Sequence, residues 1–414
     1  MTWRMAWRNL WRHRTRTLIM TSAVAFSYAL FLVSMGMGDN GHAQMLEAAA
    51  EGAGGDVLVH ADGYWDNRSS DLVIRNAQTV LNAVESAAGV EVAIPRVLVN
   101  GLVSSAAGNR PVMLQGIVPE REIALQDYAE DLEAGEFLTE STRDDPLILG
   151  ATIVEKLKLE LGDRVVLTAS DPEGEVTRAL FHLTGIVETG LPETDEGLAL
   201  TTLDAAQTAV AMDGMLTQIG VIVADGATPD SVAAAIHAAA DVQGNGLEVM
   251  TWREAIPEMV AFIEIDDAFL YIYIVVIFAV VAFAIANTFL MAVMERVREF
   301  GLLNALGLRG GGVARLLLAE TVLMTLLALA VGFTLGYSGH LAMDHWGIPV
   351  GGWGVEDMEI SGANFADLVM RSTVNPGKWI MATLAVALIT IGSALYPAYK
   401  ASSLAPSEAM RFYE

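Results

Sequence analysis

The sequence predicts a membrane protein with four transmembrane α-helices and a large α+β domain outside the membrane, between spans 1 and 2. The 414-residue chain is 53% hydrophobic and only 18% charged, whereas a typical soluble domain carries about 25% charged residues. The apolar residues are concentrated in four runs, at 17–37, 268–294, 316–337 and 379–396. Each run is long enough to cross about 30 Å of hydrocarbon as a helix, and none keeps the polar face that a buried core helix usually has.

Charge is distributed as unevenly as hydropathy. From Asp39 to Asp266 there are 39 acidic and 11 basic residues, a net charge of −28, so the rest of a chain with total charge −26 is slightly basic. A strongly acidic domain argues against nucleic-acid binding, and we expect a solvated surface there. The chain has no cysteine, which excludes disulfides, thiolate metal sites and cysteine nucleophiles.

The arginine and lysine residues that flank the spans predict the orientation in the membrane. Residues 1–16 hold five arginines and no acid, and the connection after the second apolar run is also basic. The loop before the fourth run is acidic. We therefore expect both termini in the cytoplasm and the acidic domain outside. A cleaved signal peptide within residues 1–50 is the weaker alternative, because the first apolar run exceeds the usual length of about 7–15 residues.

The expected layout follows from these runs. A cytoplasmic N-terminal segment (1–16), the first span (17–38), the external α+β domain with its stalk helices (39–267) and the second span (268–294) form the first part. The second part comprises a cytoplasmic coupling helix and loop (295–312), the third span (313–339), an external loop (340–377), the fourth span (378–398) and a cytoplasmic tail (399–414).

The external domain shows the patterns of alternating strands and helices. Its length, above the commonest domain size, suggests two subdomains. We expect strands at 56–60, 92–104, 112–118, 146–150, 164–169, 176–187, 218–224 and 247–251, and helices at 151–161, 203–211 and 231–240.

The two junctions between this domain and the spans are predicted to be helical. Apolar residues recur at helical spacing from Thr251 to Asp267 with no breaker after Pro257, which predicts one continuous helix into the second span. Asp39–Ala50 is expected to extend the first span in the same way. A flexible linker with an interfacial helix is the alternative.

No catalytic motif is visible. The one Gly-Lys pair, Gly377–Lys378, lacks the glycine that a phosphate-binding loop requires, and Gly310–Gly312 is interpreted as a turn between helices. We therefore expect a non-catalytic chain that binds no cofactor and no metal and does not hydrolyse ATP by itself. Asp171, Glu173 and Glu175 have the spacing of a calcium loop, but the other positions of an EF-hand fail, so a solvated turn is preferred.

The cytoplasmic connection, MERVREFGLLNALGL from Met294 to Leu308, places charged residues before an apolar stretch. A short amphipathic helix of this kind can dock into a partner's groove or lie on lipid headgroups, and its physical chemistry favours neither. The residues that would make the partner contact are Glu295, Arg296, Arg298, Glu299, Phe300, Leu302, Leu303 and Leu306.

This connection and both ends of the chain resemble the MacB/FtsX/LolC-LolE family of ABC-transporter permeases. The resemblance rests on MERVREFGLLNALG, on Glu320 and the glycine-rich third span, on the tail YPAYKASSLAPSEAM, and on AWRNLWRHR near the start. It covers nearly the whole chain. Residues 148–163, 188–195 and 204–207 look most like the lipoprotein-releasing LolC/LolE branch. The hairpin at Thr168–Ala179 lacks the longer insertion that, in LolC, recruits the periplasmic carrier. The chain is therefore LolE-like at this hairpin, or it belongs to a related exporter without a carrier.

The resemblance implies a multi-pass protein of the inner membrane with a periplasmic domain. Two permease protomers, a homodimer or a pair with a paralogue, would sit on a cytoplasmic ABC ATPase dimer that binds ATP and Mg. Residues 295–308 would be the coupling helix, and a lipoprotein cargo would leave the membrane toward a periplasmic carrier and the outer membrane. The alternatives are a MacB-like exporter of a peptide or small amphiphile and an FtsX-like mechanotransmitter that activates a periplasmic hydrolase.

In the lipoprotein branch, acyl chains would enter between the first two spans. The candidate cavity residues by position are Phe26, Phe31, Met35, Phe269, Ile272 and Val276, and ordinary lipid-facing or interhelical packing is the competing interpretation of each. Two polar residues also lie within the spans. Glu320 is expected to pair with Arg315 or to hold the coupling helix, and Asn287 is expected to make an interhelical hydrogen bond.

Overall fold

A computed structural model describes residues 2–12, 14–126, 128–139, 145–189, 192–240, 244, 246–295, 310–349, 359–360, 363–364 and 369–403. The chain divides into two compact units. Unit 1 contains Met1–Gln44, Phe262–Gly352 and Asp367–Glu414, and unit 2 contains Met45–Ala261 and Trp353–Ala366.

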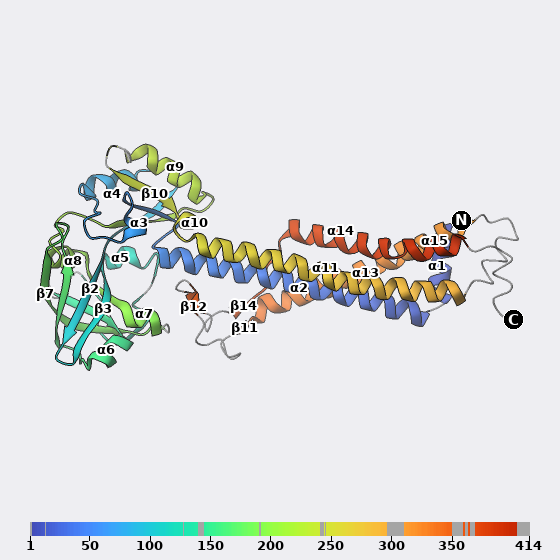
Figure 1. Ribbon diagram of the computed structural model, residues 1–414, viewed down its shortest axis with the longest axis horizontal. Helices are drawn as coiled ribbons and strands as arrows, with labels where there is room; N and C mark the ends of the chain where they lie inside the picture. The colour runs from blue at the N-terminus through green and yellow to red at the C-terminus, as the bar shows by residue number, and fades with distance from the viewer. Residues whose placement is uncertain are drawn as a thin grey trace. The chain divides into compact units, whose positions relative to one another are not determined.

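The helices of unit 1 include four that are long and apolar enough to cross a membrane, which confirms the predicted spans. The membrane-competent segments are Thr17–Ala53, Pro257–Thr288, Gly311–Trp346 and Pro376–Ser402. They belong to α2 (Arg14–Ala53), α11 (Pro257–Glu295), α13 (Gly310–Trp346) and the consecutive helices α14 (Pro376–Ser393) and α15 (Leu395–Ser403). A separate helix, α1 (Thr2–Arg12), precedes them (Figure 1).

The predicted helical junction at the first span is confirmed, and the one at the second span is confirmed from Pro257 onward but not from Thr251. The first span continues without a break to Ala53 in α2, and the second begins at Pro257 in α11. The short helix α10 (Trp252–Ala255) stops just before Pro257. Ile256 leaves the helical conformation there, with φ −128° and ψ 65°, because the ring of a following proline disfavours α geometry in the residue before it.

The helices of unit 1 pack around a shared apolar core. Its buried residues come from α2, α11, α13 and α14, and include Tyr28, Leu32, Phe278 and Val386. Two glycines of α13 allow a close approach to α2. A Cβ added to Gly332 would lie 2.7 Å from the carbonyl oxygen of Ala25, and one added to Gly336 would lie 3.3 Å from Cα of Ala29. This small-xxx-small pairing is typical of membrane helices.

Unit 2 is built on one mixed sheet of ten strands. The strand order is β10-β1-β9-β2-β3-β8-β5-β7-β4, and β6 pairs with β2 and β7. The strands are β1 (Val57–Ala61), β2 (Val90–Ser105), β3 (Gly108–Ile117), β4 (Leu132–Gly135), β5 (Pro146–Gly150), β6 (Arg164–Ser170), β7 (Val176–Val187), β8 (Leu198–Thr202), β9 (Gln218–Val223) and β10 (Leu247–Thr251).

The long strand β2 joins two groups of strands. Its first part, Val90–Arg96, pairs with β9, and its second part, Val97–Ser105, pairs with β3. Because one strand serves both groups, the two expected subdomains are parts of one continuous sheet within a single compact unit.

Short helices flank the strands of unit 2. They are α3 (Tyr64–Asn67), α4 (Ala77–Glu85), α5 (Pro119–Glu122), α6 (Ala151–Leu157), α7 (Pro192–Gly197), α8 (Leu203–Ala209) and α9 (Pro229–Ala239). Residues of α4, α6, α8 and α9 join the strands in the main core, where Val84, Ile153, Ala206 and Ile236 are buried. Two further pairs of two-residue strands lie in the segment before α14: β11 (Ile348–Pro349) pairs with β14 (Val369–Met370), and β12 (Glu359–Ile360) pairs with β13 (Ala363–Asn364).

Two details of the sequence prediction change, and a third is confirmed in part. The helix expected over 151–161 ends at Leu157, because Lys158 adopts the left-handed conformation with φ 50°. Gly310–Gly312 is the first turn of α13 and not a turn between helices. At the tip of the β6–β7 hairpin, Oδ1 of Asp171 accepts hydrogen bonds from the backbone N–H groups of Glu173 and Glu175. That carboxylate closes the turn that the preferred interpretation predicted. Glu173 and Glu175 are exposed, whereas Asp171 is buried.

Candidate functional site

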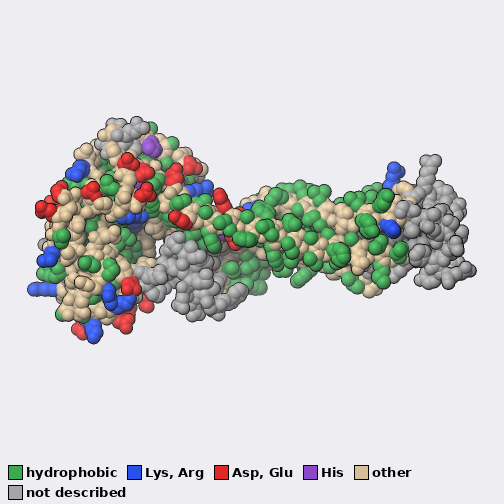
Figure 2. All heavy atoms as spheres, viewed as in Figure 1, with side chains coloured by type: hydrophobic (Ala, Val, Ile, Leu, Met, Phe, Trp, Pro, Cys, Tyr) green, Lys and Arg blue, Asp and Glu red, His purple; other side chains and the backbone are tan. Residues whose placement is uncertain are grey.

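One face of α11 carries an uninterrupted apolar stripe. Its side chains recur every three or four residues and are between 42% and 76% exposed; they are Phe262, Ile265, Phe269, Ile272, Val276, Val280 and Phe283. This spacing keeps them on one side of the helix. Figure 2 shows apolar side chains over the visible face of the helices, whereas acidic side chains are frequent on unit 2. The stripe offers a surface for hydrocarbon chains or for another helix.

Three of the six predicted cavity residues, Phe269, Ile272 and Val276, lie on this stripe. Phe26 of α2 is also 66% exposed. The other two are packed inside the bundle. The ring of Phe31 meets that of Phe278 edge to face, with centroids 5.9 Å apart, and Met35 is 2% exposed. In this conformation, four of the six are available to a ligand.

A cluster of charged residues joins α2, α11 and α14, close in sequence to the first residues of the stripe. Nζ of Lys378 lies 2.5 Å from Oδ1 of Asp39 and 3.7 Å from Oδ2 of Asp267. His42 of α2 lies 3.0 Å from Asp266 through Nε2, and 3.8 Å from Asp267 through Nδ1. These contacts connect three helices at residues that sequence reasoning did not single out, because the partners are hundreds of positions apart.

Glu320 is buried, 4% exposed, and one of its contacts, with the N-terminal helix, was not foreseen. The side-chain amide of Asn9 in α1 donates a hydrogen bond of 2.6 Å to Oε1 of Glu320 in α13. The carboxylate therefore holds the N-terminal helix against α13. Asn287 lies on an exposed part of α11 and makes no hydrogen bond with the described residues, so the expected interhelical bond is not seen in the described part of the chain.

The predicted coupling residues lie almost entirely outside the described residues. Glu295 is the last residue of α11, and the described chain resumes at Gly310 in α13. The assignment of the predicted coupling residues as an ATPase contact stays a prediction.

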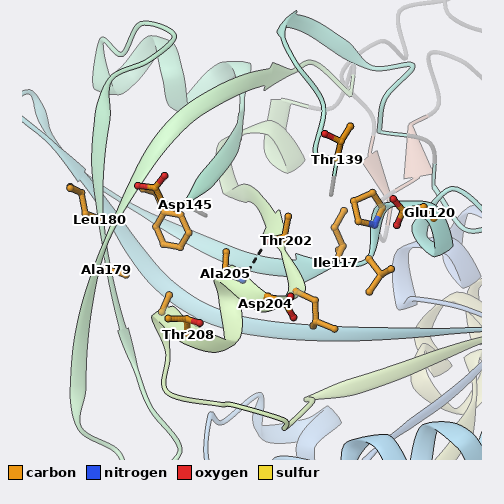
Figure 3. A pocket seen from close by; sticks show the side chains of 15 residues that line it. Ile117, Glu120, Thr139, Asp145, Ala179, Leu180, Thr202, Asp204, Ala205 and Thr208 are labelled. Atoms are coloured by element: carbon orange, nitrogen blue, oxygen red, sulfur yellow. Dashed lines mark hydrogen bonds between the residues drawn. The ribbon is translucent and has the colours of Figure 1, made fainter. Parts of the chain in front are cut away.

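Unit 2 has a cavity of about 790 Å³ that the sequence did not predict (Figure 3). Its walls come from the end of β3, from β7 and from α8, and three carboxylates line it: Glu120, Asp145 and Asp204. Oδ2 of Asp145 lies 2.6 Å from Nδ1 of His182. Thr202 caps α8 by accepting a hydrogen bond from the N–H of Ala205. Among the described residues that line the cavity, none is basic.

Comparisons with known proteins agree with this architecture. Residues 17–239 match the MacB-like periplasmic core domain, and residues 271–406 match the FtsX-like permease C-terminal family. The lipoprotein-releasing system transmembrane protein LolC of Neisseria meningitidis is 28% identical over 86% of this chain and 85% of its own length. LolE of Haemophilus influenzae is 21% identical over 86% of this chain and 85% of its own length.

Among solved structures, the periplasmic region of MacB from Actinobacillus actinomycetemcomitans is similar, with a TM-score of 0.36 and 14% identity. The match covers 51% of this chain and 94% of that one. The first family match covers more than half of the chain, and the second covers two of the four candidate spans in full and part of a third. The chain therefore belongs to the family of FtsX-like permeases with a MacB-like periplasmic core domain, as its coupling segment and both of its ends predicted.

Proposed function

We propose that this chain is the permease subunit of an ABC transporter that extracts lipoproteins from the outer leaflet of the inner membrane for release toward the outer membrane. A separate cytoplasmic ATPase dimer supplies the energy, and the chain works as one of two permease protomers. In this arrangement both termini are cytoplasmic and the α+β domain is periplasmic.

The apolar stripe of α11 is the observation that carries the proposal. A triacylated protein presents hydrocarbon chains joined to a polar polypeptide, so its binding site needs a long apolar surface and access to water at one end. The stripe begins at Phe262 and Ile265, next in sequence to the charged cluster around Asp266 and Asp267, and continues to Phe283. The relatives named for lipoprotein release share most of the length of this chain.

A site-specific crosslinking experiment tests the cargo. The photoreactive residue p-benzoylphenylalanine replaces Phe269 or Val276 in cells, and the products are identified by mass spectrometry. The matched control is Leu388 of α14, which is 72% exposed but lies off the stripe. We expect triacylated protein to be crosslinked at Phe269 and Val276 and not at Leu388.

Three outcomes contradict the lipoprotein proposal in different ways. Equal crosslinking of triacylated protein at all three positions would show that the stripe is an ordinary lipid-facing surface. Crosslinks to a soluble peptide or small amphiphile, without lipoprotein, favour a MacB-like exporter. Crosslinks only to a second copy of the chain or a paralogue assign the stripe to the protomer interface.

The ATPase contact is tested at the predicted coupling segment. Glu299→Lys or Leu303→Asp is expected to leave the complex assembled but to remove the stimulation of ATP hydrolysis by cargo, because the segment would dock these residues into the ATPase. Pull-down of the ATPase and its hydrolysis rate with and without lipoprotein are the readouts. If lipoprotein still stimulates ATP hydrolysis in both variants, the assignment of this segment as the ATPase contact is wrong.

A further inference from the structure

The N-terminal helix α1 carries two adjacent rows of side chains. Trp3, Trp7 and Trp11 recur every four residues and are 56%, 48% and 54% exposed. Arg4, Arg8 and Arg12 follow them by one position and are also exposed. Tryptophan beside arginine on one helix is the composition of a segment at the membrane–water boundary.

Contacts with α13 fix the position of α1. Ala6 is fully buried and forms a small apolar cluster with Leu316 and Ala319, and Asn9 binds Glu320. The helix is therefore packed into the bundle and not a free arm, so the space beside it is enclosed by packed helices.

A small apolar cavity of about 110 Å³ lies between α1, α2 and α13. Trp7 and Trp11 line it from α1, and Leu323 and Leu327 line it from α13. All four side chains are apolar or aromatic, so the cavity suits a hydrocarbon chain better than water, which needs polar partners.

Three polar side chains of α2 line the same cavity: Arg14, Thr17 and Thr21. Thr17 is already hydrogen-bonded within the bundle, which leaves two of them for a ligand. Thr21 is 6% exposed, and its hydroxyl has no hydrogen-bond partner among the described residues. Other threonines in the bundle are satisfied: Thr17 donates to the carbonyl of Leu10 at 3.0 Å, and Thr325 donates to that of Thr321 at 2.8 Å. A buried hydroxyl without a partner is costly, so an acceptor from a ligand would stabilise it.

Arg14 is the second polar group. Its Nε donates to the carbonyl of Trp11 at 3.2 Å, and its guanidinium carbon lies 5.8 Å from the centre of the Trp11 ring. The terminal Nη groups have no partner among the described residues. Along α2, Arg14 and Thr21 are seven residues apart, about 10 Å, so the charged group and the hydroxyl line the cavity at different depths.

We propose that this cavity binds an anionic glycerophospholipid from the leaflet on the α1 side of the membrane. Part of one acyl chain lies beside Trp7, Leu323 and Leu327 in the cavity. An ester carbonyl of the lipid accepts a hydrogen bond from Thr21, and the phosphate meets the guanidinium of Arg14.

Charge complementarity selects an anionic lipid over a zwitterionic one. Residues 1–16 carry five arginines and no acid, and basic residues at a membrane surface attract anionic headgroups. The bound lipid would fill the space between the N-terminal helix and the spans. The proposal does not depend on the identity of the cargo, because it concerns the end of the bundle opposite to the charged cluster on α2.

Lipid competition on the purified full-length chain tests the proposal. The chain is placed in nanodiscs of phosphatidylglycerol and phosphatidylcholine, and the lipids retained after release from the nanodisc are counted by native mass spectrometry. We expect selective retention of phosphatidylglycerol. Arg14→Gln should reduce that selectivity about fivefold, since one basic residue near a membrane surface contributes about 1 kcal/mol. Thr21→Val should reduce retention of both lipids.

Matched variants separate the cavity from general attraction to the headgroups. Arg4→Gln removes a charge from α1 without touching the cavity, and Thr334→Val removes an exposed hydroxyl that is bonded to Ala330. Both should behave like the wild type. If Arg4→Gln and Arg14→Gln lower the selectivity equally, the attraction is diffuse and the proposal is overturned.

A measurement on the unmodified chain tests the proposal without any variant that could misfold. Phosphatidylglycerol with brominated acyl chains should quench tryptophan fluorescence more strongly than brominated phosphatidylcholine at the same mole fraction, because Trp7 and Trp11 line the cavity. Equal quenching by the two lipids contradicts the proposal.

Discussion

Nζ of Lys378, in the first turn of α14, lies 2.5 Å from Oδ1 of Asp39 in α2. Lys378 is 25% exposed and Asp39 is 14% exposed, and Oδ2 of Asp39 is buried without a partner among the described residues. This ion pair links the first and fourth spans, and through Asp267 it also reaches the second.

Lys378→Met is expected to destabilise the chain by about 1–3 kcal/mol, because it leaves a mostly buried carboxylate without its counter-charge. Thermal unfolding of the reconstituted chain measures the loss. The double variant with Asp39→Asn should lose less than the sum of the two single variants. Lys156→Met is the control, since its partner Glu196 is 48% exposed and exposed ion pairs contribute little to stability. Strictly additive losses at Lys378 and Asp39 would show that the two residues do not interact.

Gly332 governs the contact between α2 and α13. Gly332→Ala places a methyl group 2.7 Å from the carbonyl oxygen of Ala25 and 2.8 Å from the ring of Tyr28. Because backbone cannot move aside without separating the helices, we expect a destabilisation of about 1–3 kcal/mol and a lower unfolding temperature. Gly38→Ala in α2 meets no atom within 4 Å, and it should be neutral or stabilising by about 0.5–1 kcal/mol. The prediction fails if the two variants behave alike.

His60 is expected to make the folding of unit 2 sensitive to acid. The side chain is fully buried in β1, its Nδ1 bonds to the carbonyl of Ala61, and its ring stacks on Trp65. Burial lowers the pKa of His60, against smaller opposing effects from the Ala61 carbonyl and the Glu248 carboxylate. The folded chain therefore keeps this imidazole neutral at pH values where the unfolded chain protonates it.

The sign of the pH dependence follows from the depressed pKa. Above the unfolded pKa of about 6.5, both states are neutral and this histidine adds no pH dependence. As the pH falls below that value, protons bind the unfolded state first, and stability is lost by at most about 1.4 kcal/mol per pH unit. Hydrogen exchange of the β1 amides, corrected for intrinsic rates, should show weaker protection at pH 5.5 than at pH 7.5. His60→Gln should flatten this change, and the exposed His237→Gln should not. An unchanged pH response in His60→Gln would contradict the explanation.

Strands with a clear apolar or alternating sequence pattern between turn residues were predicted correctly. The strands at Pro146–Gly150, Val176–Val187 and Leu247–Thr251 have the predicted bounds, because each is a short apolar or alternating run between turn residues. Helix α4 and strand β8 were not predicted. Ala77–Glu85 is short and mixed in composition, and Leu198–Thr202 is an apolar run that fits either a strand or the start of α8.

The site was less predictable than the fold. The positions of Phe269, Ile272 and Val276 on one exposed face follow from helical periodicity alone. By contrast, the pairing of Asn9 with Glu320 joins residues 311 positions apart, and no local rule brings α1 against α13. The sequence could not place Met35 either. An apolar residue in a span is equally compatible with a cavity and with the bundle core, and only the packing of the helices decides between them.

Arg96 and Glu122 form a buried ion pair in unit 2, 5% and 1% exposed. Nε of Arg96 donates to Oε2 of Glu122 at 3.1 Å, and Nη2 donates to Oε1. Burial raises the pKa of the neighbouring Tyr128, against a smaller lowering by the charge of Arg96. Glu122→Ala leaves the guanidinium buried and unpaired, so we expect a loss of about 3–5 kcal/mol. The double variant Arg96→Met with Glu122→Leu removes both charges and should be closer to the wild type than either single variant. Chemical unfolding followed by near-UV circular dichroism measures the three variants, and a double variant as unstable as the summed singles would show that the pair is not an electrostatic unit.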